Sequence, residues 1–303
     1  MTPLFIGPEV EARLDWLALT RALADGHRRP KAEIGDTFLY RDPDTLLSRS
    51  AWIDGLGALV KTATVFPGNA TAGKPTIGGA VSLFSDQDGT LAAILDFGLV
   101  TKWKTAGDSL LAATRLARPD SRTILIVGSG TVARSLVSAY AAAFPAAQFL
   151  IWSRTPGNAD RLAKATGAVA MASLQDAVAR ADIVSCATMS SDPVLNGAWL
   201  RPGQHIDLIG AYRPDMREVD DIALLNARIF VDARDTTLDH IGELKIPLST
   251  GAISRADVLA DYYDGDQMRR QSEEEITLFK NGGGAHLDLM TARYILEASA
   301  GEA

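Results

Sequence analysis

The chain has 303 residues, of which 47% are hydrophobic, so it can form a large buried core and favours two lobes over one. Its formal net charge of -7 argues against a surface for nucleic acid or an anionic membrane, because both require clustered Lys and Arg. No apolar run approaches the roughly 20 residues that cross a bilayer, and the first residues lack the features of a signal peptide. We expect a cytoplasmic globular protein without nucleic-acid or membrane partners.

Cysteine and histidine are too few and too scattered for a metal site. The single cysteine, Cys186, excludes an intrachain disulfide, and the four His residues show no metal-ligand spacing. We therefore expect no bound metal.

The N-terminal part combines helices with short strands. Apolar residues at helical spacing predict a helix over residues 9–25, which Gly26 ends. From Gly57 to Phe97, short apolar runs separated by Gly, Asn and Asp-Gly predict antiparallel hairpins. A second helix is predicted over 101–117, and the polar, proline-containing stretch after it predicts a domain boundary.

Beyond this boundary, strands alternate with helices, which predicts an α/β fold with a doubly wound parallel sheet covered on both faces. The predicted strands are 123–127, 149–152, 168–171, 182–186, 205–209 and 228–232. The amphipathic stretch 285–299 predicts a helix that packs back on the first lobe. The predicted domains are therefore 1–118 together with 285–303, of α+β type, and 119–284.

A glycine-rich turn follows the first of these strands. In TILIVGSGTVARSL, Gly128 permits a tight turn, Gly130 lets the backbone approach a pyrophosphate, and Ala133 keeps the next helix close to the strand. The helix N-terminus offers unpaired N–H groups and a positive dipole end to phosphates. The alternative is a turn used only for packing. We predict a dinucleotide site made by Gly128, Ser129, Gly130, Thr131, Val132 and Ala133.

The end of the second strand bears on which dinucleotide binds. NAD enzymes usually have Asp or Glu about twenty residues after the glycine motif, where it binds the ribose 2′-hydroxyl. Here Ser153, Arg154 and Thr155 supply a cation and two hydroxyl groups, which suit a 2′-phosphate. We therefore expect NADPH rather than NADH as the cofactor. The alternative is that Arg154 stacks on the adenine or faces solvent.

Two more segments follow strands of the predicted parallel sheet. Ligands of such sheets bind beyond the carboxyl ends of the strands. Small and hydroxylated residues after the fourth and fifth strands suit a floor for the nicotinamide ring, and neither segment supplies an obvious catalytic base. The residues concerned are Ala187, Thr188, Met189, Ile209 and Gly210.

The first lobe contains cations in unusual places. Lys61 lies within the apolar run GALVKTATVF, where a buried lysine is costly unless paired. Lys104 lies at the start of a predicted helix, where the dipole disfavours a cation unless an anion binds nearby. Arg28 and Arg29 precede a proline in a polar loop. Together they could bind a small carboxylate; the alternatives are an edge-strand lysine, a solvated helix start and a solvated loop.

Several stretches resemble the ornithine cyclodeaminase/mu-crystallin family. They are the run from VKTATVFPGN to TKWKTAGDSLLAA, the turn VGSGTVA, GAYRPDMREVDD and the closing GGGAHLDLMTA. The resemblance covers nearly the whole chain. It implies an N-terminal lobe that binds substrate and forms a homodimer through its sheet. It also implies a Rossmann lobe and a C-terminal helix that returns to the first lobe.

Details of these motifs distinguish branches of the family. Cyclodeaminases carry an acidic residue two places after the glycine that follows the fifth strand, and here that place holds Tyr212. RPDMREVDD and IWSRT resemble instead the ketimine reductase branch, which prefers NADPH. The family usually has an arginine in place of Lys104 and an apolar residue in place of Arg49. Arg49 is therefore a candidate replacement cation in the substrate pocket.

These features together predict a reductase of cyclic imino acids that uses NADPH. The expected substrates are Δ1-pyrroline-2-carboxylate and Δ1-piperideine-2-carboxylate, which would give L-proline and L-pipecolate. We expect Lys61, Lys104 and either Arg28 or Arg29 to hold the carboxylate. Lys61 is the expected proton donor and Tyr212 a second candidate. The alternatives are reductive amination of a 2-oxo acid as in alanine dehydrogenases, ornithine cyclodeamination, and a non-catalytic NADPH-binding protein.

Overall fold

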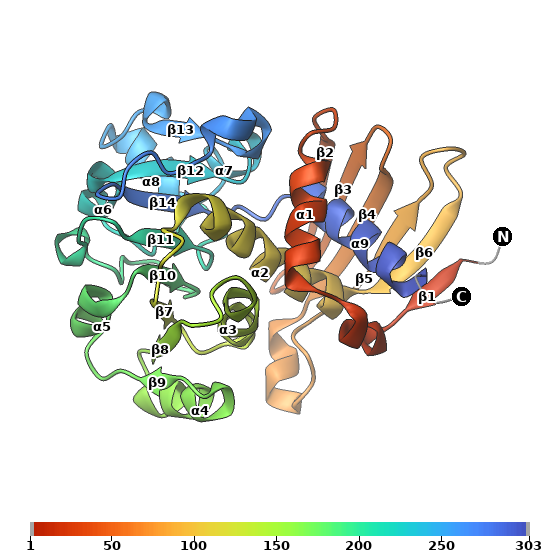
Figure 1. Cartoon of the computed structure of the whole chain (residues 1–303). Helices are drawn as coiled ribbons and strands as arrows, with labels where there is room; N and C mark the ends of the chain where they lie inside the picture. The colour runs from red at the N-terminus through yellow and green to blue at the C-terminus, as the bar shows by residue number, and fades with distance from the viewer. Residues whose placement is uncertain (1–2, 301–303) are drawn as a thin grey trace. The chain divides into compact units, whose positions relative to one another are not determined.

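The computed structural model describes residues 3–300, and they form two compact units. One unit comprises residues 3–104 together with 283–300, and the other is Thr105–Gly282 (Figure 1). The sequence predicted boundaries at 118/119 and 284/285 between a substrate-binding domain and a cofactor-binding domain. This division by function stays a prediction.

A six-stranded sheet forms the centre of the first unit. Its strand order is β1-β6-β5-β4-β3-β2, in which β1 pairs with β6 in parallel and the other neighbours are antiparallel. The strands are β1 (Leu4–Ile6), β2 (Glu33–Arg41), β3 (Asp44–Ile53), β4 (Gly57–Val65), β5 (Ile77–Phe84) and β6 (Leu91–Asp96). The predicted hairpins correspond to β4, β5 and β6. Strands β1, β2 and β3 were not predicted. Strand β2 lies exposed at the sheet edge along its whole length and shows no alternation of buried and exposed residues.

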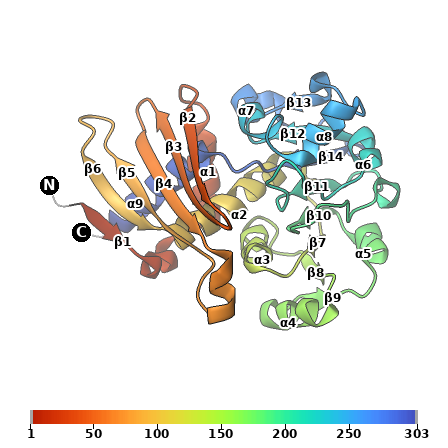
Figure 2. The same ribbon diagram turned by 180° about the vertical axis from the view of Figure 1, so that it is seen from behind.

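Two helices cover one face of this sheet. Helix α9 (Ala285–Ala300) packs against β3, β4 and β5, and α1 (Trp16–Gly26) packs along α9 (Figure 1). In Figure 2 the opposite face of the sheet is turned toward the viewer and α9 lies behind the strands. The C-terminal helix therefore joins the first lobe, as predicted.

The helix predicted over 9–25 is interrupted. A 3-10 helix covers Pro8–Arg13, Leu14 is extended, and α1 begins at Trp16. The side chain of Asp15 accepts a hydrogen bond from the N–H of Ala18, which makes Asp15 the N-cap of a new helix. The apolar periodicity runs through this break and hid it.

Helix α2 (Phe97–Leu116) begins earlier than predicted. The Asp96 carboxylate accepts a hydrogen bond from the N–H of Leu99 at 2.6 Å and so caps the first turn. Lys104 consequently lies about two turns inside the helix. The prediction that Lys104 stands at a helix start was wrong, so the dipole gives no reason for an anion beside it.

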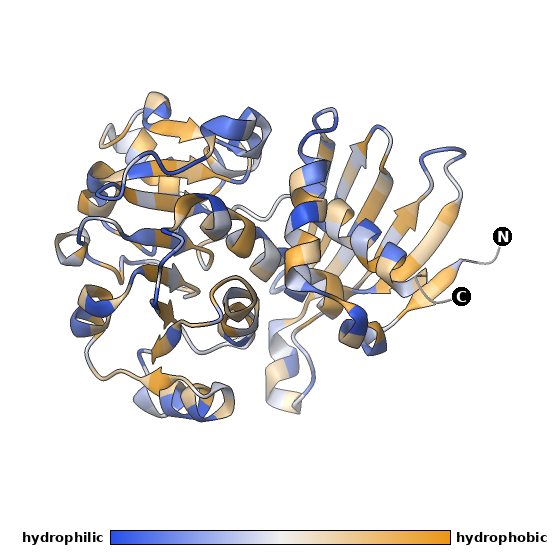
Figure 3. Cartoon of the chain, in the orientation of Figure 1, coloured by the Kyte–Doolittle hydropathy of each residue, from blue (hydrophilic) through white to orange (hydrophobic). Residues whose placement is uncertain are grey.

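The second unit contains an eight-stranded parallel sheet of order β13-β12-β14-β11-β10-β7-β8-β9. Its apolar strands are coloured mainly orange in Figure 3. Strand order reverses between β7 and β10, which is the topology of the doubly wound Rossmann fold and confirms the predicted fold class. The strands are β7 (Thr123–Val127), β8 (Gln148–Trp152), β9 (Val169–Ala170), β10 (Ile183–Cys186), β11 (His205–Leu208), β12 (Ala227–Val231), β13 (Val258–Ala260) and β14 (Ile276–Lys280).

Strands β13 and β14 were not predicted from the sequence. Strand β13 has three residues, which is too short for a periodic signal, and β14 follows a run of glutamates and ends in a buried lysine. The helices of this unit are α3 (Thr131–Ala143), α4 (Pro156–Thr166), α5 (Leu174–Arg180), α6 (Asp221–Asn226), α7 (Arg234–Thr237) and α8 (Gly242–Thr250).

A buried carboxylate connects elements of the second unit. Asp207 in β11 accepts hydrogen bonds from the hydroxyl groups of Ser109 at 3.0 Å, Tyr140 at 2.9 Å and Ser185 at 2.6 Å. Its complete burial raises its pKa from 3.8 to about 6, although these hydroxyl groups and the charge of Lys280 act in the opposite direction.

This shift predicts a pH-dependent contribution to stability. Between pH 4 and 6 the folded protein binds more protons at Asp207 than the unfolded chain does, so the free energy of unfolding falls as the pH rises. Urea unfolding at several pH values should show wild type losing up to about 3 kcal/mol relative to Asp207→Asn across this window. A difference that does not vary with pH would contradict the shift.

Candidate cofactor and substrate sites

The residues predicted to bind the cofactor lie at one edge of the parallel sheet. They follow β8, β7, β10 and β11, which are neighbouring strands, at their carboxyl ends. Backbone hydrogen bonds continue across these ends: the N–H of Gly128 donates to Trp152, that of Ala187 to Val127, and that of Ile209 to Cys186, each at 2.8 Å. The structure therefore brings the four predicted segments together.

The glycine turn leaves room for a phosphate. Gly128 has a φ of 129°, and a Cβ there would lie 2.7 Å from the carbonyl oxygen of Ala187. A Cβ on Gly130 would meet no atom of residues 3–300 within 4 Å. Gly130 is the N-cap of α3, and no side chain within the described residues caps this helix. Uncapped N–H groups beside open space fit a pyrophosphate, as the sequence predicts.

The residues after β8 form an exposed, hydroxyl-rich turn. The hydroxyl groups of Ser129 and Ser153 are hydrogen-bonded at 3.0 Å, which connects this turn to the glycine turn. Arg154 and Thr155 are exposed, and Thr155 is the N-cap of α4 without a side-chain capping bond. A cation beside an uncapped helix start is suited to bind a phosphate group.

The loops after β10 and β11 differ in exposure. Met189 and Tyr212 are 77% and 59% exposed, whereas Ile209 is nearly buried. The guanidinium of Arg213 lies 5.8 Å from the centre of the Tyr212 ring. Tyr212 therefore stands at the surface of its own unit, where a bound ligand could reach its hydroxyl group.

In the first unit, three charged residues form a row across the sheet. Asp36 in β2 is directly opposite Arg49 in β3, and Arg49 is directly opposite Lys61 in β4. Residues that are paired in this way point to the same side of a sheet. Arg49 and Asp36 form an ion pair at 2.9 Å. Two adjacent cations, Arg49 and Lys61, destabilise a sheet unless anions compensate them.

Helix α9 supplies the compensating anion. The Lys61 ammonium lies 2.9 Å from Oδ1 of Asp288, and both side chains are buried. The ammonium also lies 4.8 Å from the centre of the Phe97 ring. Burial alone would raise the pKa of Asp288, but Lys61 and Lys104 hold it below the ordinary value, so Asp288 is ionised. Its Oδ2 atom is buried and accepts no hydrogen bond from a described residue.

A backbone carbonyl group gathers the other two cations. The oxygen of Gly283 accepts hydrogen bonds from Arg49 at 3.0 Å and from Lys104 at 3.2 Å. We call Arg49, Lys61 and Lys104 the cation cluster. It contacts Gly283, just before α9, and Asp288, in the first turn of α9. The buried lysine predicted at position 61 is thus paired, and Lys104 and Arg49 lie with it.

A histidine beside the cluster stays neutral. His286 lies in the first turn of α9 and is buried. Its burial and the nearby charge of Lys104 lower its pKa to about 3. His286 therefore adds no positive charge to the site at neutral pH.

The arginine pair is not brought into the cation cluster. Arg28 is exposed and pairs with Asp25 at 2.6 Å. Arg29 donates to the carbonyl oxygen of Gly55 in the turn between β3 and β4. That turn precedes β4, and Lys61 lies about 13 Å further along the strand. A role of Arg28 or Arg29 in substrate binding stays a prediction.

Asp288 was missed at the sequence level. Its signal was a single carboxylate among apolar residues in AHLDLMTA, opposite in charge to a lysine already identified as needing a partner. The two residues are 227 positions apart, so no local pattern connects them.

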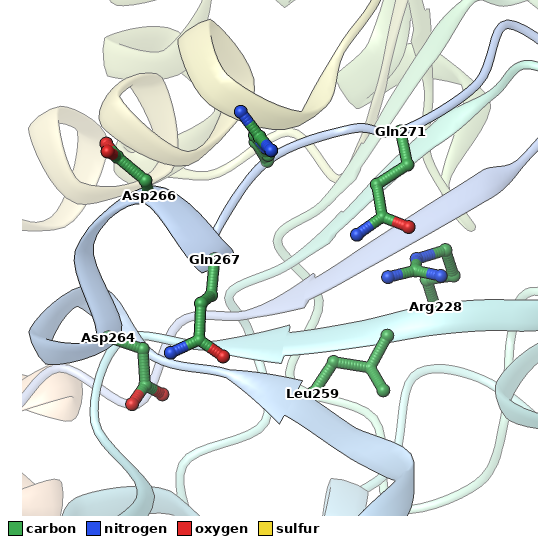
Figure 4. Close-up of a pocket in the computed structure, with 7 residues that line it drawn as sticks. Arg228, Leu259, Asp264, Asp266, Gln267 and Gln271 are labelled. Carbon is green, nitrogen blue, oxygen red and sulfur yellow. The ribbon is translucent and has the colours of Figure 1, made fainter.

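A separate pocket lies in the second unit (Figure 4). Its volume is about 380 Å³, and its lining is polar apart from Leu259. Arg228 stands at the amino end of β12, whereas the cofactor residues follow carboxyl ends of strands. The lining residues are Arg228, Leu259, Asp264, Asp266, Gln267, Arg269 and Gln271. None of these was predicted to bind cofactor or substrate.

Residues 3–300 contain neither a membrane-spanning helix nor a cluster of metal ligands. No helix in this range is long and apolar enough to cross a membrane. No group of three or more His, Cys, Asp or Glu residues in the same range could hold a metal ion.

Comparison with known proteins identifies the family. The model of the ornithine cyclodeaminase/mu-crystallin family matches residues 53–302. The chain belongs to this family. The resemblance noted in the sequence motifs is thereby confirmed, and it extends over both units.

Individual relatives agree with this assignment. The chain is 53% identical over 302 residues to a Delta(1)-pyrroline-2-carboxylate reductase of Paracoccus denitrificans, which covers 97% of this chain and 96% of that protein. It is 32% identical to the ketimine reductase mu-crystallin of Mus musculus, over 78% of this chain and 75% of the relative. Among solved structures, an archaeal alanine dehydrogenase dimer with bound NAD has a TM-score of 0.89 and 27% identity, covering 99% of this chain and 96% of that one.

Proposed function

We propose that the protein reduces Δ1-pyrroline-2-carboxylate to L-proline with NADPH, and that it also accepts Δ1-piperideine-2-carboxylate and gives L-pipecolate. The observation that carries the proposal is the buried ion pair of Lys61 and Asp288 within the cation cluster. A buried, charged lysine beside two further cations suits an imine that bears a carboxylate. The relative with 53% identity, a Delta(1)-pyrroline-2-carboxylate reductase, supports the same substrate.

Lys104 and Arg49 are suited to hold the substrate carboxylate. Both now donate to the neutral carbonyl oxygen of Gly283. An ionised carboxylate is a stronger acceptor than a carbonyl group, and the guanidinium of Arg49 offers a two-pronged donor set. Positive charge beside the carboxylate raises the electrophilicity of the adjacent imine carbon and fixes its position.

Lys61 is suited to supply the proton. Asp288 accepts a hydrogen bond from the Lys61 ammonium at 2.9 Å and holds it in place, and Nζ is then the group that would donate a proton to the imine nitrogen. NADPH, when bound, supplies the hydride that the imine carbon receives. The carbon–nitrogen double bond becomes a single bond, and the product is a secondary amine. Tyr212, which is exposed on its own unit, stays a second candidate donor.

The preference for NADPH rests on Arg154. A charge-assisted contact with the 2′-phosphate contributes about 1.5–3 kcal/mol, so Arg154→Ala is expected to raise the KM for NADPH by roughly 10- to 100-fold. The KM for NADH should stay unchanged. Steady-state kinetics with both cofactors measure this effect. Arg180→Ala, which removes another exposed arginine of the same unit, is the matched control. Equal losses with NADH and NADPH would refute a phosphate-binding role.

The uncovered face of the six-stranded sheet supports a homodimer. Phe5, Leu39 and Trp52 are 74%, 61% and 56% exposed. The strand register places them on the side opposite Lys61 and α9. Large apolar side chains exposed on one face of a sheet are typical of a protein–protein interface. Dimerisation through this face, and a cytoplasmic location, are parts of the proposal.

The deciding experiment follows cofactor oxidation with several substrates. NADPH consumption is measured with Δ1-pyrroline-2-carboxylate, with Δ1-piperideine-2-carboxylate, and with pyruvate plus ammonia or methylamine. Rapid oxidation with the cyclic imines alone would support the proposal. Turnover confined to pyruvate and an amine would favour an alanine-dehydrogenase-like activity. NADPH binding without any turnover would favour a binding protein, and ornithine is then the next compound to test.

A further inference from the structure

The loops after β10 and β11 are in direct backbone contact. The two strands are neighbours in the sheet. A Cβ on Gly210 would lie 1.8 Å from the carbonyl oxygen of Thr188 and 2.4 Å from its nitrogen. Only glycine permits this approach. A side chain at position 210 would therefore force the two loops apart, in the part of the second unit proposed to carry the nicotinamide ring.

One buried carboxylate holds both loops. Oε1 of Glu218 accepts hydrogen bonds from the N–H and the hydroxyl group of Thr188, each at 2.8 Å. Oε2 accepts from the N–H of Gly210 at 2.6 Å and from that of Ala211 at 3.3 Å. Glu218 has no exposed surface. Four donors from two loops thus converge on one side chain.

The surrounding residues fix Glu218 itself. The Glu243 carboxylate accepts from the N–H of Glu218 at 2.7 Å and from that of Val219 at 3.1 Å. Lys280 is fully buried and donates to the carbonyl oxygen of Leu208, the last residue of β11. Burial raises the pKa of Glu218 to about 7, and the charge of Glu243 adds to this shift. The charge of Lys280 and the hydrogen bonds from Thr188 oppose it and favour the ionised form.

Four donors require a group that only accepts. An ionised carboxylate has about four lone-pair positions, whereas a glutamine amide presents two N–H donors on one of its ends. We propose that Glu218 is a positioning residue for the nicotinamide end of the cofactor, and that it acts through Thr188 and Gly210. Glu218 itself contacts neither the substrate nor the transferred hydride. This role rests on the proposed nicotinamide-dependent function. Its chemical task is to keep two loops at the spacing that a ring requires.

The test compares the whole cofactor with a fragment. In Glu218→Gln we expect kcat for Δ1-pyrroline-2-carboxylate to fall by about 10- to 100-fold, because small misplacements of reacting groups have effects of this size. The affinity for NADPH should fall as well. The affinity for 2′-phospho-ADP-ribose, which lacks the nicotinamide, should stay within about twofold of wild type. A general loss of structure would instead lower the affinity for both NADPH and 2′-phospho-ADP-ribose.

Asp182 provides a matched control, because it lies directly before the start of β10, whereas Thr188 follows the end of that strand. Its carboxylate accepts from the N–H groups of Arg122 at 2.8 Å and Thr123 at 3.0 Å, just before β10 begins. Asp182→Asn should lower stability without changing the ratio of NADPH to fragment affinity. An unchanged ratio and kcat in Glu218→Gln, or an equal change in Asp182→Asn, would overturn the proposal.

Two further variants test the proposal even if Glu218→Gln does not fold. Thr188→Val removes one donor to Glu218 and should reproduce part of the loss, whereas Thr188→Ser keeps the hydroxyl group and should lose less than Thr188→Val. Equal effects of Val and Ser would overturn the proposal. The ratio of the affinities for NADPH and for 2′-phospho-ADP-ribose can be measured without any turnover. If wild type binds NADPH but reduces no imine, the imine reductase assignment fails while the role of Glu218 is still measured.

Discussion

Replacing Lys61 with methionine is expected to lower kcat for imine reduction by roughly 10²- to 10⁴-fold, the usual contribution of a general acid. NADPH binding should be unchanged, because the predicted cofactor residues all belong to the other unit. Steady-state rates with Δ1-pyrroline-2-carboxylate and titration of NADPH fluorescence measure the two properties. A methionine has nearly the length of the lysine chain, so packing beside Phe97 is kept.

A neighbouring lysine gives the control for this prediction. Lys102 belongs to the same unit, is partly exposed and pairs with Glu11. Lys102→Met removes an equal charge without touching the cation cluster and should leave kcat within about twofold of wild type. Near-normal turnover of Lys61→Met would exclude Lys61 as the proton donor and would direct attention to Tyr212.

Removing the partner of Lys61 is expected to affect folding as strongly as catalysis. Asp288→Ala leaves a buried ammonium without its 2.9 Å counter-ion, and breaking a buried pair in this way costs about 3–5 kcal/mol. Urea unfolding measures the loss. The depressed pKa of Asp288 adds a pH dependence: its stabilising contribution is present above the unfolded pKa of about 3.8 and is lost as the pH falls through the lower folded value.

The double variant separates stability from chemistry. Lys61→Met combined with Asp288→Ala removes both charges of the pair, so the net charge of the site stays as in wild type. Its free energy of unfolding should recover well above that of Asp288→Ala alone, while imine reduction stays absent. If the loss of unfolding free energy in the double variant equals the sum of the losses in the two single variants, the ion pair is energetically unimportant in the folded protein.

The sequence predicted best where the signal was local. The strand before Gly128 and the helix after it are adjacent in the chain, so one short motif identified the turn, its open Gly130 side and the fold around it. Strand β2 escaped because an exposed edge strand has no alternation of buried and exposed residues. Helix α2 was placed too late because its cap, Asp96, ends a strand rather than a polar loop.

The substrate site was predicted only in part, for a related reason. Lys61 was conspicuous because charge is costly in an apolar strand, but its partner comes from the far end of the chain. Arg28 and Arg29 were predicted as a pair, and the structure places them in contact with Asp25 and Gly55 rather than in the cation cluster, so their role in substrate binding stays a prediction. Arg49 was found through a departure from the family pattern, and the strand register then placed it beside Lys61.

The row of charges across β2, β3 and β4 has a consequence for selectivity. Counted with Lys104 and Asp288, the five side chains carry three positive and two negative charges, and the neutral His286 leaves this balance unchanged. The set is therefore short of a single anion. One monocarboxylate brings it to neutrality, whereas a dicarboxylate leaves an excess negative charge in a buried place. On the proposed function, we therefore expect charge balance to favour an imine with one carboxylate over an imine with two.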